Sequence, residues 1–223
     1  PEAEPESEPE TEPETEPESE PEAEPEGDSW IQLGDDIDGE AAGDYNGHSV
    51  SLSSDGSIVA IGAYWNDSNG NNSGHVRVYK YNGNSWTILG SEIDGENADD
   101  QSGYSVSLSG DGSVVAIGAP FNDGNGSDSG SVSVYSYNGL DWTKLGQNIY
   151  GEAYLDYSGQ SVSLSSDGSI VAIGAHFNDG DTDNDNDNEG GGGGWGDERG
   201  HVRVYSYSEN DNSWIILGED IDG

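Results

Sequence analysis

The sequence contains no cysteine and no methionine, and it has only 5 lysine or arginine residues against 46 aspartate or glutamate residues. The absence of cysteine excludes disulfide bonds and thiolate chemistry. The formal net charge of −41 argues against nucleic acid and anionic membranes as direct partners, since both are negatively charged. Long apolar runs are also missing, so the sequence predicts no insertion into a membrane.

Residues 1–27 form a low-complexity tract in which proline recurs with a period of four and glutamate fills every second position. Proline at this spacing excludes helix and sheet, and repulsion between like charges extends the chain. We therefore expect an extended or polyproline II segment that serves as a stalk or linker. It is either a plain solvated spacer or a stalk that is glycosylated on its hydroxyl side chains. The candidate positions are Ser7, Thr11, Thr15 and Ser19.

The rest of the chain, residues 28–223, is built from three copies of one sequence unit. The copies start at Gly47, Gly103 and Gly159, and the middle one reads GYSVSLSGDGSVVAIGAPFND. A tryptophan marks the phase of the repeat, with successive separations of 56, 56 and 72 residues, at Trp30, Trp86, Trp142 and Trp214. The longest interval holds an insertion at residues 181–200. Self-similarity at such a period is typical of a repeat architecture.

Each copy predicts four short strands. In the middle copy, residues 105–109 alternate small polar and apolar side chains, as a half-buried strand does. An Asp-Gly turn at 110–113 leads into an apolar run at 114–119, which we expect to be fully buried and innermost. Alternation resumes at 131–137, and a fourth strand follows at 142–145. Four antiparallel strands in a unit of this size predict a propeller blade.

The sequence thus predicts an all-β fold of three β-propeller-type blades, at about residues 30–85, 86–141 and 142–213, plus one extra strand. Strands of the fourth type stand at both ends of this region, at 30–33 and at 214–217. Closed propellers usually have about four to eight blades, whereas three blades leave an open edge at each end. Proteins cover or pair such edges. We therefore expect head-to-tail self-association, or further blades that continue the stack.

The repeated unit resembles the FG-GAP repeat, the blade of the integrin α-subunit propeller. Between Gly103 and Tyr135 the matching features are Gly-x-Ser-Val, the Asp-Gly turn, the Ile-Gly-Ala run and a later Gly-x-Val-x-Val-Tyr. The resemblance extends over residues 28–223. It implies a β-propeller of a kind found mostly in extracellular or cell-surface modules that bind proteins or glycans. In that family the hairpin often holds calcium through oxygen ligands at loop positions 1, 3, 5 and 9.

The hairpins of this chain depart from that calcium pattern. The side chains at the four loop positions are Ser51, Ser53, Asp55 and Val59, then Ser107, Ser109, Asp111 and Val115, then Ser163, Ser165, Asp167 and Val171. One carboxylate per hairpin is too little charge for a hard divalent cation. The sequence therefore predicts tight turns without metal, in which aspartate and glycine serve the backbone.

Two other acidic groups are candidate calcium sites. The first recurs in the linkers between blades, where alternate carboxylates could converge on one ion. Its members are Asp36, Asp38, Glu40 and Asp44, then Glu92, Asp94, Glu96 and Asp100, while the third copy has Asn148, Tyr150, Glu152 and Asp156. The second lies in the insertion, at Asp181, Asp183, Asp185, Asp187 and Glu189. A solvated linker face and a loose surface loop are the respective alternatives.

The sequence offers no catalytic constellation, so we expect no enzymatic activity and no cofactor other than this candidate calcium. Two of its histidines, His75 and His201, share one repeat position. The recurring tryptophans are expected in the core. Aromatic residues after each buried strand either pack beneath a loop or form a rim for sugars, at Trp65, Phe121 and Phe177. Glycosylation sequons begin at Asn66, Asn71 and Asn125.

Two functional hypotheses follow. The first is an extracellular or cell-surface structural or adhesive protein that forms or decorates a fibre or matrix by blade-to-blade assembly. The near-identical copies, the open blade number and the charged proline tract favour it. The alternative is a module that binds a protein or glycan, with or without calcium, as part of a larger closed propeller.

Overall fold

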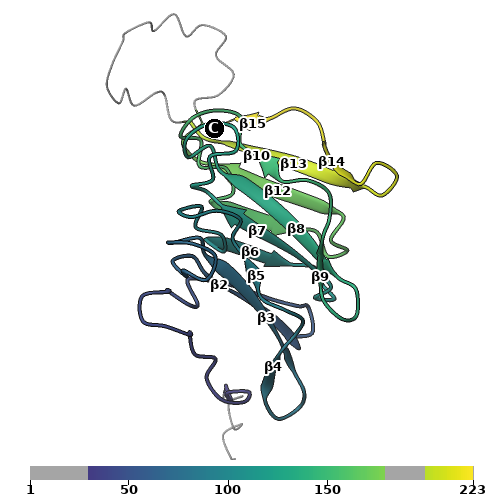
Figure 1. Ribbon diagram of the computed structural model, residues 1–223. Helices are drawn as coiled ribbons and strands as arrows, with labels where there is room; N and C mark the ends of the chain where they lie inside the picture. The colour runs from purple at the N-terminus through teal and green to yellow at the C-terminus, as the bar shows by residue number, and fades with distance from the viewer. Residues whose placement is uncertain (1–29, 179–198, 223) are drawn as a thin grey trace, which may run out of the picture. The chain divides into compact units, whose positions relative to one another are not determined.

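The computed structural model describes residues 30–178 and 199–222. These residues form three antiparallel sheets that follow one another along the chain (Figure 1). The described part contains no helix, and therefore none that is long and apolar enough to cross a membrane. The prediction of an all-β fold made of repeated four-stranded blades is confirmed.

Each sheet has four strands in chain order and a short fifth strand. The first sheet consists of β1 (Ser49–Leu52), β2 (Ile58–Ala63), β3 (His75–Tyr81), β4 (Trp86–Ile88) and β5 (Ile93–Asp94). The second consists of β6 (Ser105–Leu108), β7 (Val114–Ala119), β8 (Ser131–Tyr137), β9 (Trp142–Lys144) and β10 (Ile149–Tyr150). The third consists of β11 (Ser161–Leu164), β12 (Ile170–Ala175), β13 (His201–Ser208), β14 (Ser213–Ile216) and β15 (Ile221–Asp222).

The hairpin between the first two strands of each sheet is closed by the predicted Asp-Gly turn. Its glycine adopts a left-handed conformation in all three copies, with φ of 70° at Gly56 and 71° at Gly112 and Gly168. A residue with a Cβ adopts this conformation only at a cost, which explains the glycine. The turn sets the register that places Ser51 opposite Ala60 and Leu52 opposite Val59.

The fifth strand was not predicted from the sequence. Ile93 pairs with Val76 at the start of β3, and β10 and β15 repeat this pairing in the other two sheets. The segment was interpreted only as an acidic linker, because two residues are too short a run to show a strand period. Its isoleucine nevertheless joins the core in the first two sheets.

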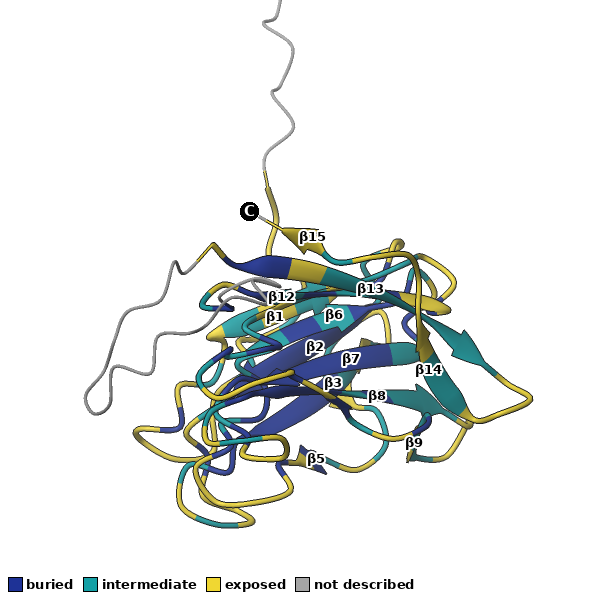
Figure 2. Ribbon diagram, turned by 90° about the horizontal axis from the view of Figure 1, so that it is seen from above, coloured by how far each residue is buried: buried dark blue, intermediate teal, exposed yellow. Residues whose placement is uncertain are grey.

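The sheets meet along their first strands, since β6 contacts both β1 and β11. The prediction that the apolar run at 114–119 is innermost was therefore wrong, because β7 is the second strand from this edge. The predicted burial holds for all of β2 and for β7 beyond its first residue, and both strands are mostly dark blue in Figure 2. In β12 burial alternates instead, because no further sheet among the described residues covers its second face.

The core lies between consecutive sheets rather than within one sheet. One cluster joins Ile58, Val76 and Ile93 of the first sheet to Val106 and Leu108 of the second. A second cluster repeats this arrangement between the second and third sheets. Each fully buried aliphatic side chain contributes about 1.5–3 kcal/mol to such a junction. Stability therefore comes from stacking one blade on the next.

Two further expectations need correction. Residues 30–33 form no strand, because no strand of the β3 type precedes them among the described residues for them to pair with. The recurring tryptophans lie at the edge of the core and not inside it, since those in β4, β9 and β14 are half-buried, Trp142 and Trp214 pack against the core clusters, and Trp30 is exposed.

The tract at 1–27 and the acidic residues at 181–189 lie outside the described residues. The sheets span residues 49–94, 105–150 and 161–222, so units counted from each tryptophan divide a sheet before its fourth strand.

Candidate functional site

The junction between consecutive sheets uses the same hydrogen bonds at both places where it occurs. The Ser49 hydroxyl donates to the carbonyl oxygen of Gly103 at 2.7 Å, and the backbone N–H of Leu108 donates to Ser51 Oγ at 2.9 Å. Ser105 with Gly159, and Leu164 with Ser107, repeat both bonds at 2.7 and 2.9 Å. The inner edge of one blade is thus built to receive the inner edge of the next.

A tryptophan closes the outer part of each junction. The indole N–H of Trp142 donates to the carbonyl oxygen of Leu89 at 2.7 Å, and that of Trp214 donates to Leu145 at 3.0 Å. Trp86 makes the same bond, at 2.7 Å, to Leu33 in the segment that precedes the first sheet. At each of its three positions in a fourth strand, the tryptophan thus binds the linker that precedes its sheet.

One side of the first sheet has the residues of such a junction but no partner among the described residues. Val106 and Leu108 of the second sheet are 9% and 7% exposed, whereas the equivalent Val50 and Leu52 are 62% and 59% exposed. Both pairs occupy the same positions in identical SVSL strands. The difference in burial therefore comes from the missing neighbour. We call this surface the leading face.

The third sheet has the complementary open surface, which we call the trailing face. It carries the residues equivalent to those that the first sheet buries against the second, namely Ile170, Val202 and Ile221. Ile221 in β15 is 60% exposed, whereas the equivalent Ile93 is 5% exposed. The leading face and the trailing face are thus copies of two surfaces that already fit one another inside the chain. Together they are the first candidate site, a site for another blade.

The hairpin aspartates accept hydrogen bonds from serines of their own turn. Asp55 Oδ1 accepts hydrogen bonds from the backbone N–H of Ser57 at 2.9 Å and from Ser53 Oγ at 2.7 Å. These bonds, led by the backbone bond, lower the pKa of Asp55 to about 2. Asp167 makes the equivalent bonds, and its pKa is also lowered to about 2. The hairpins thus do not fit the calcium site of the family, because their single carboxylate already serves the turn.

Two of the linker acids tie a loop to the sheet. Asp44 and Asp100 are buried, and each accepts a hydrogen bond from an asparagine amide after the second strand. Asn66 donates to Asp44 at 2.9 Å, and Asn122 donates to Asp100 at 2.8 Å. The sequon residue Asn66 therefore has its amide buried in a structural bond. The other two sequon asparagines, Asn71 and Asn125, are exposed.

The remaining linker acids of the first two copies are spread over the linker surface. Asp36, Asp38 and Asp94 are exposed, and the backbone carbonyl of Asp38 accepts a hydrogen bond from Arg77. Glu96 forms an ion pair with Lys144. The predicted groups of alternating carboxylates therefore do not converge on one point. Two of these acids, Glu40 and Glu92, do enter one cluster of potential metal ligands, but they come from different linkers and meet there with a histidine at the start of β3.

That cluster consists of Glu40, His75 and Glu92, whose ligand atoms all lie within 4.8 Å of one another. Burial, together with the positive charge of Arg77, lowers the pKa of His75 and so favours the neutral imidazole. Burial and the neighbouring Glu40 carboxylate raise the pKa of Glu92. The sequence showed that His75 and His201 are equivalent, but it gave no sign that acids from two different linkers meet at this position.

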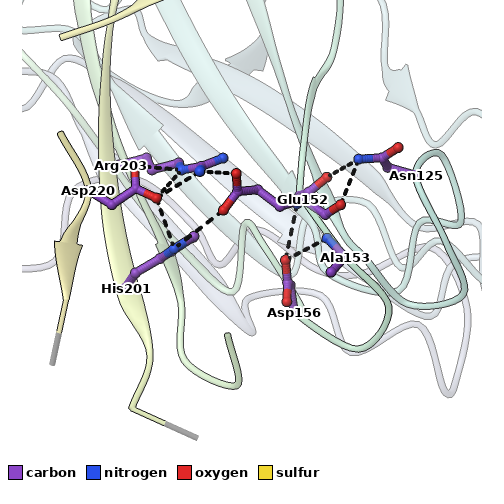
Figure 3. Close-up of polar contacts among 8 residues, drawn as sticks. Asn125, Glu152, Ala153, Asp156, His201, Arg203 and Asp220 are labelled. Atoms are coloured by element: carbon purple, nitrogen blue, oxygen red, sulfur yellow. Dashed lines mark hydrogen bonds and ion pairs between the residues drawn. The ribbon is translucent and has the colours of Figure 1, made fainter. Parts of the chain in front are cut away.

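The third sheet carries the equivalent cluster of Glu152, His201 and Asp220 (Figure 3). Here Arg203 lies between the two carboxylates. It donates to Asp220 from Nε at 2.8 Å and from Nη2 at 2.7 Å, and it forms an ion pair with Glu152. His201 Nδ1 is 3.5 Å from Asp220. The guanidinium thus pairs with both acids of this copy.

A row of aromatic rings crosses the loops that follow the second strands, and we call it the aromatic row. Neighbouring ring centroids are 4.8–6.4 Å apart along Trp65, Tyr45, Tyr64, Tyr104, Phe121, Tyr157 and Phe177. Trp65 and Tyr45 are exposed at one end, whereas Phe121 and Phe177 are half-buried. Phe121 and Phe177 therefore pack among other rings, as one interpretation of the sequence expected. Trp65 at the first blade is exposed, as the alternative of an aromatic rim requires.

Comparison with protein families gives one match. Residues 37–79 and 94–135 match the family model of the FG-GAP repeat. These segments hold β1, β2 and most of β3, then β6, β7 and most of β8. The chain therefore contains FG-GAP repeats and folds as a β-propeller-type repeat module, as the sequence resemblance implied.

Three of the solved structures that match this chain are the following. A protein from Bacteroides uniformis, described as a candidate 6-phosphogluconolactonase, is 12% identical with a TM-score of 0.48, covering 78% of this chain and 39% of its own. Hydrazine synthase of Kuenenia stuttgartiensis is 14% identical with a TM-score of 0.42, covering 78% and 36%. Sqt1 of Saccharomyces cerevisiae is 13% identical with a TM-score of 0.42, covering 80% and 35%. The chain thus spans about two fifths of these proteins or less. No curated protein sequence matches it.

Proposed function

We propose that the protein is a non-catalytic structural module that assembles blade to blade, with the leading face of one copy docked on the trailing face of the next. We place it outside the cell or at its surface, where FG-GAP repeats are typically found, as a component of a fibre or matrix. The observation that carries the proposal is the exposure of Val50 and Leu52, at 62% and 59%, in a strand whose copy in the second sheet is buried.

The internal junction provides the template for the proposed contact. In the chain, Ser51 Oγ receives the N–H of Leu108 and Ser105 Oγ donates to Gly159. In a head-to-tail pair, Ser163 of one copy would receive the N–H of Leu52, and Ser161 would donate to Gly47. The contact would thus repeat known bonds and bury known apolar positions.

The two ends of the described chain also duplicate one element. Residues 33–38 read LGDDID and residues 217–222 read LGEDID. In an assembled pair, both segments would compete for the position beside β13, which β15 occupies in the single chain. Docking therefore requires one of the two segments to give up this position, and the burial of Ile221 on the trailing face applies where β15 keeps it.

Electrostatics decides which contacts can hold such an assembly together. With a formal charge of −41, copies repel one another over a Debye length of about 8–10 Å in ordinary salt. Attraction must then come from short-range terms, namely apolar burial and backbone hydrogen bonds. A head-to-tail contact is heterologous, so it produces a filament if the rotation does not close and a ring if it does.

The test is light scattering and electron microscopy of the full 223-residue chain, in low and in high salt. We expect particles larger than one chain, favoured by salt, and their loss in a Val50→Glu/Leu52→Glu variant. The matched control is Leu140→Glu, which places a charge on an 82% exposed leucine in a hairpin away from both faces. A monomeric parent under all conditions, or equal loss in the control variant, would contradict the proposal.

The alternative function, a module that binds a protein or glycan within a larger closed propeller, is favoured by the exposed end of the aromatic row. Exposed tryptophan and tyrosine rings offer flat apolar surface with polar edges. This proposal predicts that oligosaccharides quench tryptophan fluorescence in the parent chain and that Trp65→Ala removes the effect. No quenching by a broad set of oligosaccharides would leave assembly as the proposal.

A further inference from the structure

We propose that Glu40, His75 and Glu92 form a binding site for one divalent transition-metal ion such as Zn²⁺. The site lies where the linker before the first sheet, the start of β3 and the segment before β5 come together. It is separate from the leading and trailing faces and does not depend on the proposed assembly.

The imidazole of His75 carries the argument. It is 0% exposed, and neither Nδ1 nor Nε2 has a hydrogen-bond partner within the described residues. Buried polar atoms are almost always satisfied, and leaving one unpaired costs about 1–3 kcal/mol. An imidazole that is held in this way beside two carboxylates has a lone pair directed at a ligand position. A metal ion bound here would satisfy one of the two unpaired ring nitrogens.

The two carboxylates complete the ligand set. Glu40 and Glu92 come from successive linkers, and their side chains are close enough for a hydrogen bond between the carboxyl groups. Arg77 forms an ion pair with Glu40 through Nη1, 3.3 Å from Oε1, while its Nη2 donates to the carbonyl of Asp38 and to Asn46 Oδ1. Glu92 has no ion-pair partner in the described structure. The local balance thus retains negative charge that a divalent cation would neutralise.

In the other two blades every acid at this position pairs with a basic side chain, whereas in the first blade Arg77 pairs with Glu40 alone. In the second, Ser131 and Asn148 replace the histidine and the second acid, and Lys144 pairs with Glu96. In the third, Arg203 bridges both acids, as Figure 3 shows. Only the first blade combines an unpaired histidine with an acid that lacks a basic partner. We therefore assign the metal site to the first blade alone.

The donor set selects the class of metal. One imidazole nitrogen and two carboxylate oxygens suit Zn²⁺ and neighbouring first-row ions, with any open position filled by water. Calcium instead requires six to eight oxygen ligands, which this position does not provide. The ion expected here therefore differs from the calcium of the FG-GAP hairpins, both in kind and in place.

The experiment is calorimetric titration of the full chain with ZnCl₂ and, separately, CaCl₂, at neutral pH in physiological salt. The variants are His75→Ser, which installs the residue of the second blade, and Glu92→Gln. The matched control is His201→Ser at the equivalent position of the third blade. Weak binding to the many other carboxylates forms a background that all variants share. Nitrogen-15 spectra of the imidazoles provide an independent readout, and circular dichroism reports whether each variant is folded.

We expect one strong Zn²⁺ site in the parent and in His201→Ser, with affinity lowered at least about tenfold in His75→Ser and in Glu92→Gln. Zn²⁺ should shift a ring nitrogen of His75 and leave those of His201 in place, and Ca²⁺ should not compete. Equal Zn²⁺ binding in all four proteins, or no strong site in the parent, overturns the proposal. If His75→Ser does not fold, Glu92→Gln and the imidazole spectra still decide the outcome.

Discussion

The indole nitrogen of Trp142 lies 2.7 Å from the carbonyl oxygen of Leu89 and donates a hydrogen bond to it across the junction of two sheets. The same ring packs on the core cluster between those sheets although it is only half-buried. One side chain thus joins the fourth strand of a blade to the linker of the preceding blade. The recurrence of tryptophan at this position follows from that double role.

Replacement of Trp142 by phenylalanine should therefore destabilise the protein by more than its lost area implies. The variant keeps an aromatic ring but leaves the Leu89 carbonyl without its donor, which costs about 0.5–1.5 kcal/mol. Urea unfolding should show a lower midpoint with an unchanged slope. The control is Trp65→Phe, since the Trp65 indole is exposed and packs on other rings. Equal midpoints for the two variants would contradict the assigned role.

Each second strand has a glycine at its fifth position, and the effect of replacing it by alanine should differ between an internal junction and the open trailing face. A Cβ on Gly118 would lie 1.9 Å from the backbone oxygen of Gly159, so Gly118→Ala should cost about 3 kcal/mol or more. A Cβ on Gly174 would meet only the rotatable Ser161 hydroxyl, at 2.4 Å. Gly174→Ala should thus change the unfolding free energy by less than about 1 kcal/mol.

The same pair of variants bears on assembly. Inside the chain, Gly118 faces the backbone of Gly159. In a head-to-tail pair, Gly174 would face the equivalent residue of the next copy, Gly47. Gly174→Ala should therefore leave the single chain folded while abolishing association in light scattering. Association that survives in Gly174→Ala would show that copies meet by some other surface.

The strands of this fold could be predicted from the sequence because their signals are local. The alternation of SVSL, the Asp-Gly turn and the run VVAIGA each depend on neighbours in the chain, and β6, β7 and β8 lie where these signals place them. The two-residue β5, β10 and β15 could not be predicted. Each of them consists of an isoleucine and the residue after it. In the first sheet these two residues form a strand only because they pair with the start of β3, where Val76 lies seventeen residues before Ile93.

The candidate sites depend on contacts between blades, which a single repeat does not encode. The exposure of Val50 and the burial of Val106 arise from identical local sequence and differ only in whether a neighbour is present. Likewise, His75 and Glu40 are 35 positions apart in the chain. Their convergence required the linker to curl back over β3. Carboxylates within one linker, which the sequence offered as a candidate site beside the alternative of a solvated linker face, point to different partners.

The register of assembly can be tested by cross-linking, because the chain has no cysteine of its own. Leu108 N is 2.9 Å from Ser51 Oγ, so the two residues are neighbours and a short bifunctional thiol reagent should join them within the chain in a Ser51→Cys/Leu108→Cys variant. The equivalent pair across two copies is Ser163→Cys with Leu52→Cys. This second variant should give a ladder of covalent oligomers with the same reagent. The first variant calibrates the geometry, and a second variant that stays monomeric while the first cross-links would contradict head-to-tail docking.

The hairpin aspartates predict how the fold responds to acid. The pKa of Asp55 is lowered from its ordinary value of 3.8 to about 2 by bonds that exist only in the folded hairpin, and the pKa of Asp167 is lowered likewise. A group whose pKa is lower when folded stabilises the protein above the unfolded value and loses this contribution as the pH falls. The loss should therefore occur between pH 3.8 and about pH 2.

Residue-specific NMR titration can check the cause as well as the value. Ser57→Ala removes the hydroxyl bond to Asp55, which is 2.9 Å long, but leaves the backbone bond in place. The pKa of Asp55 should then rise toward its ordinary value, while that of Asp167 in the same molecule stays at about 2. A parent Asp55 that titrates near 3.8 would mean that these hairpin bonds are not formed in solution. The carboxylate would then be free for the cation that the hairpins of this family often bind.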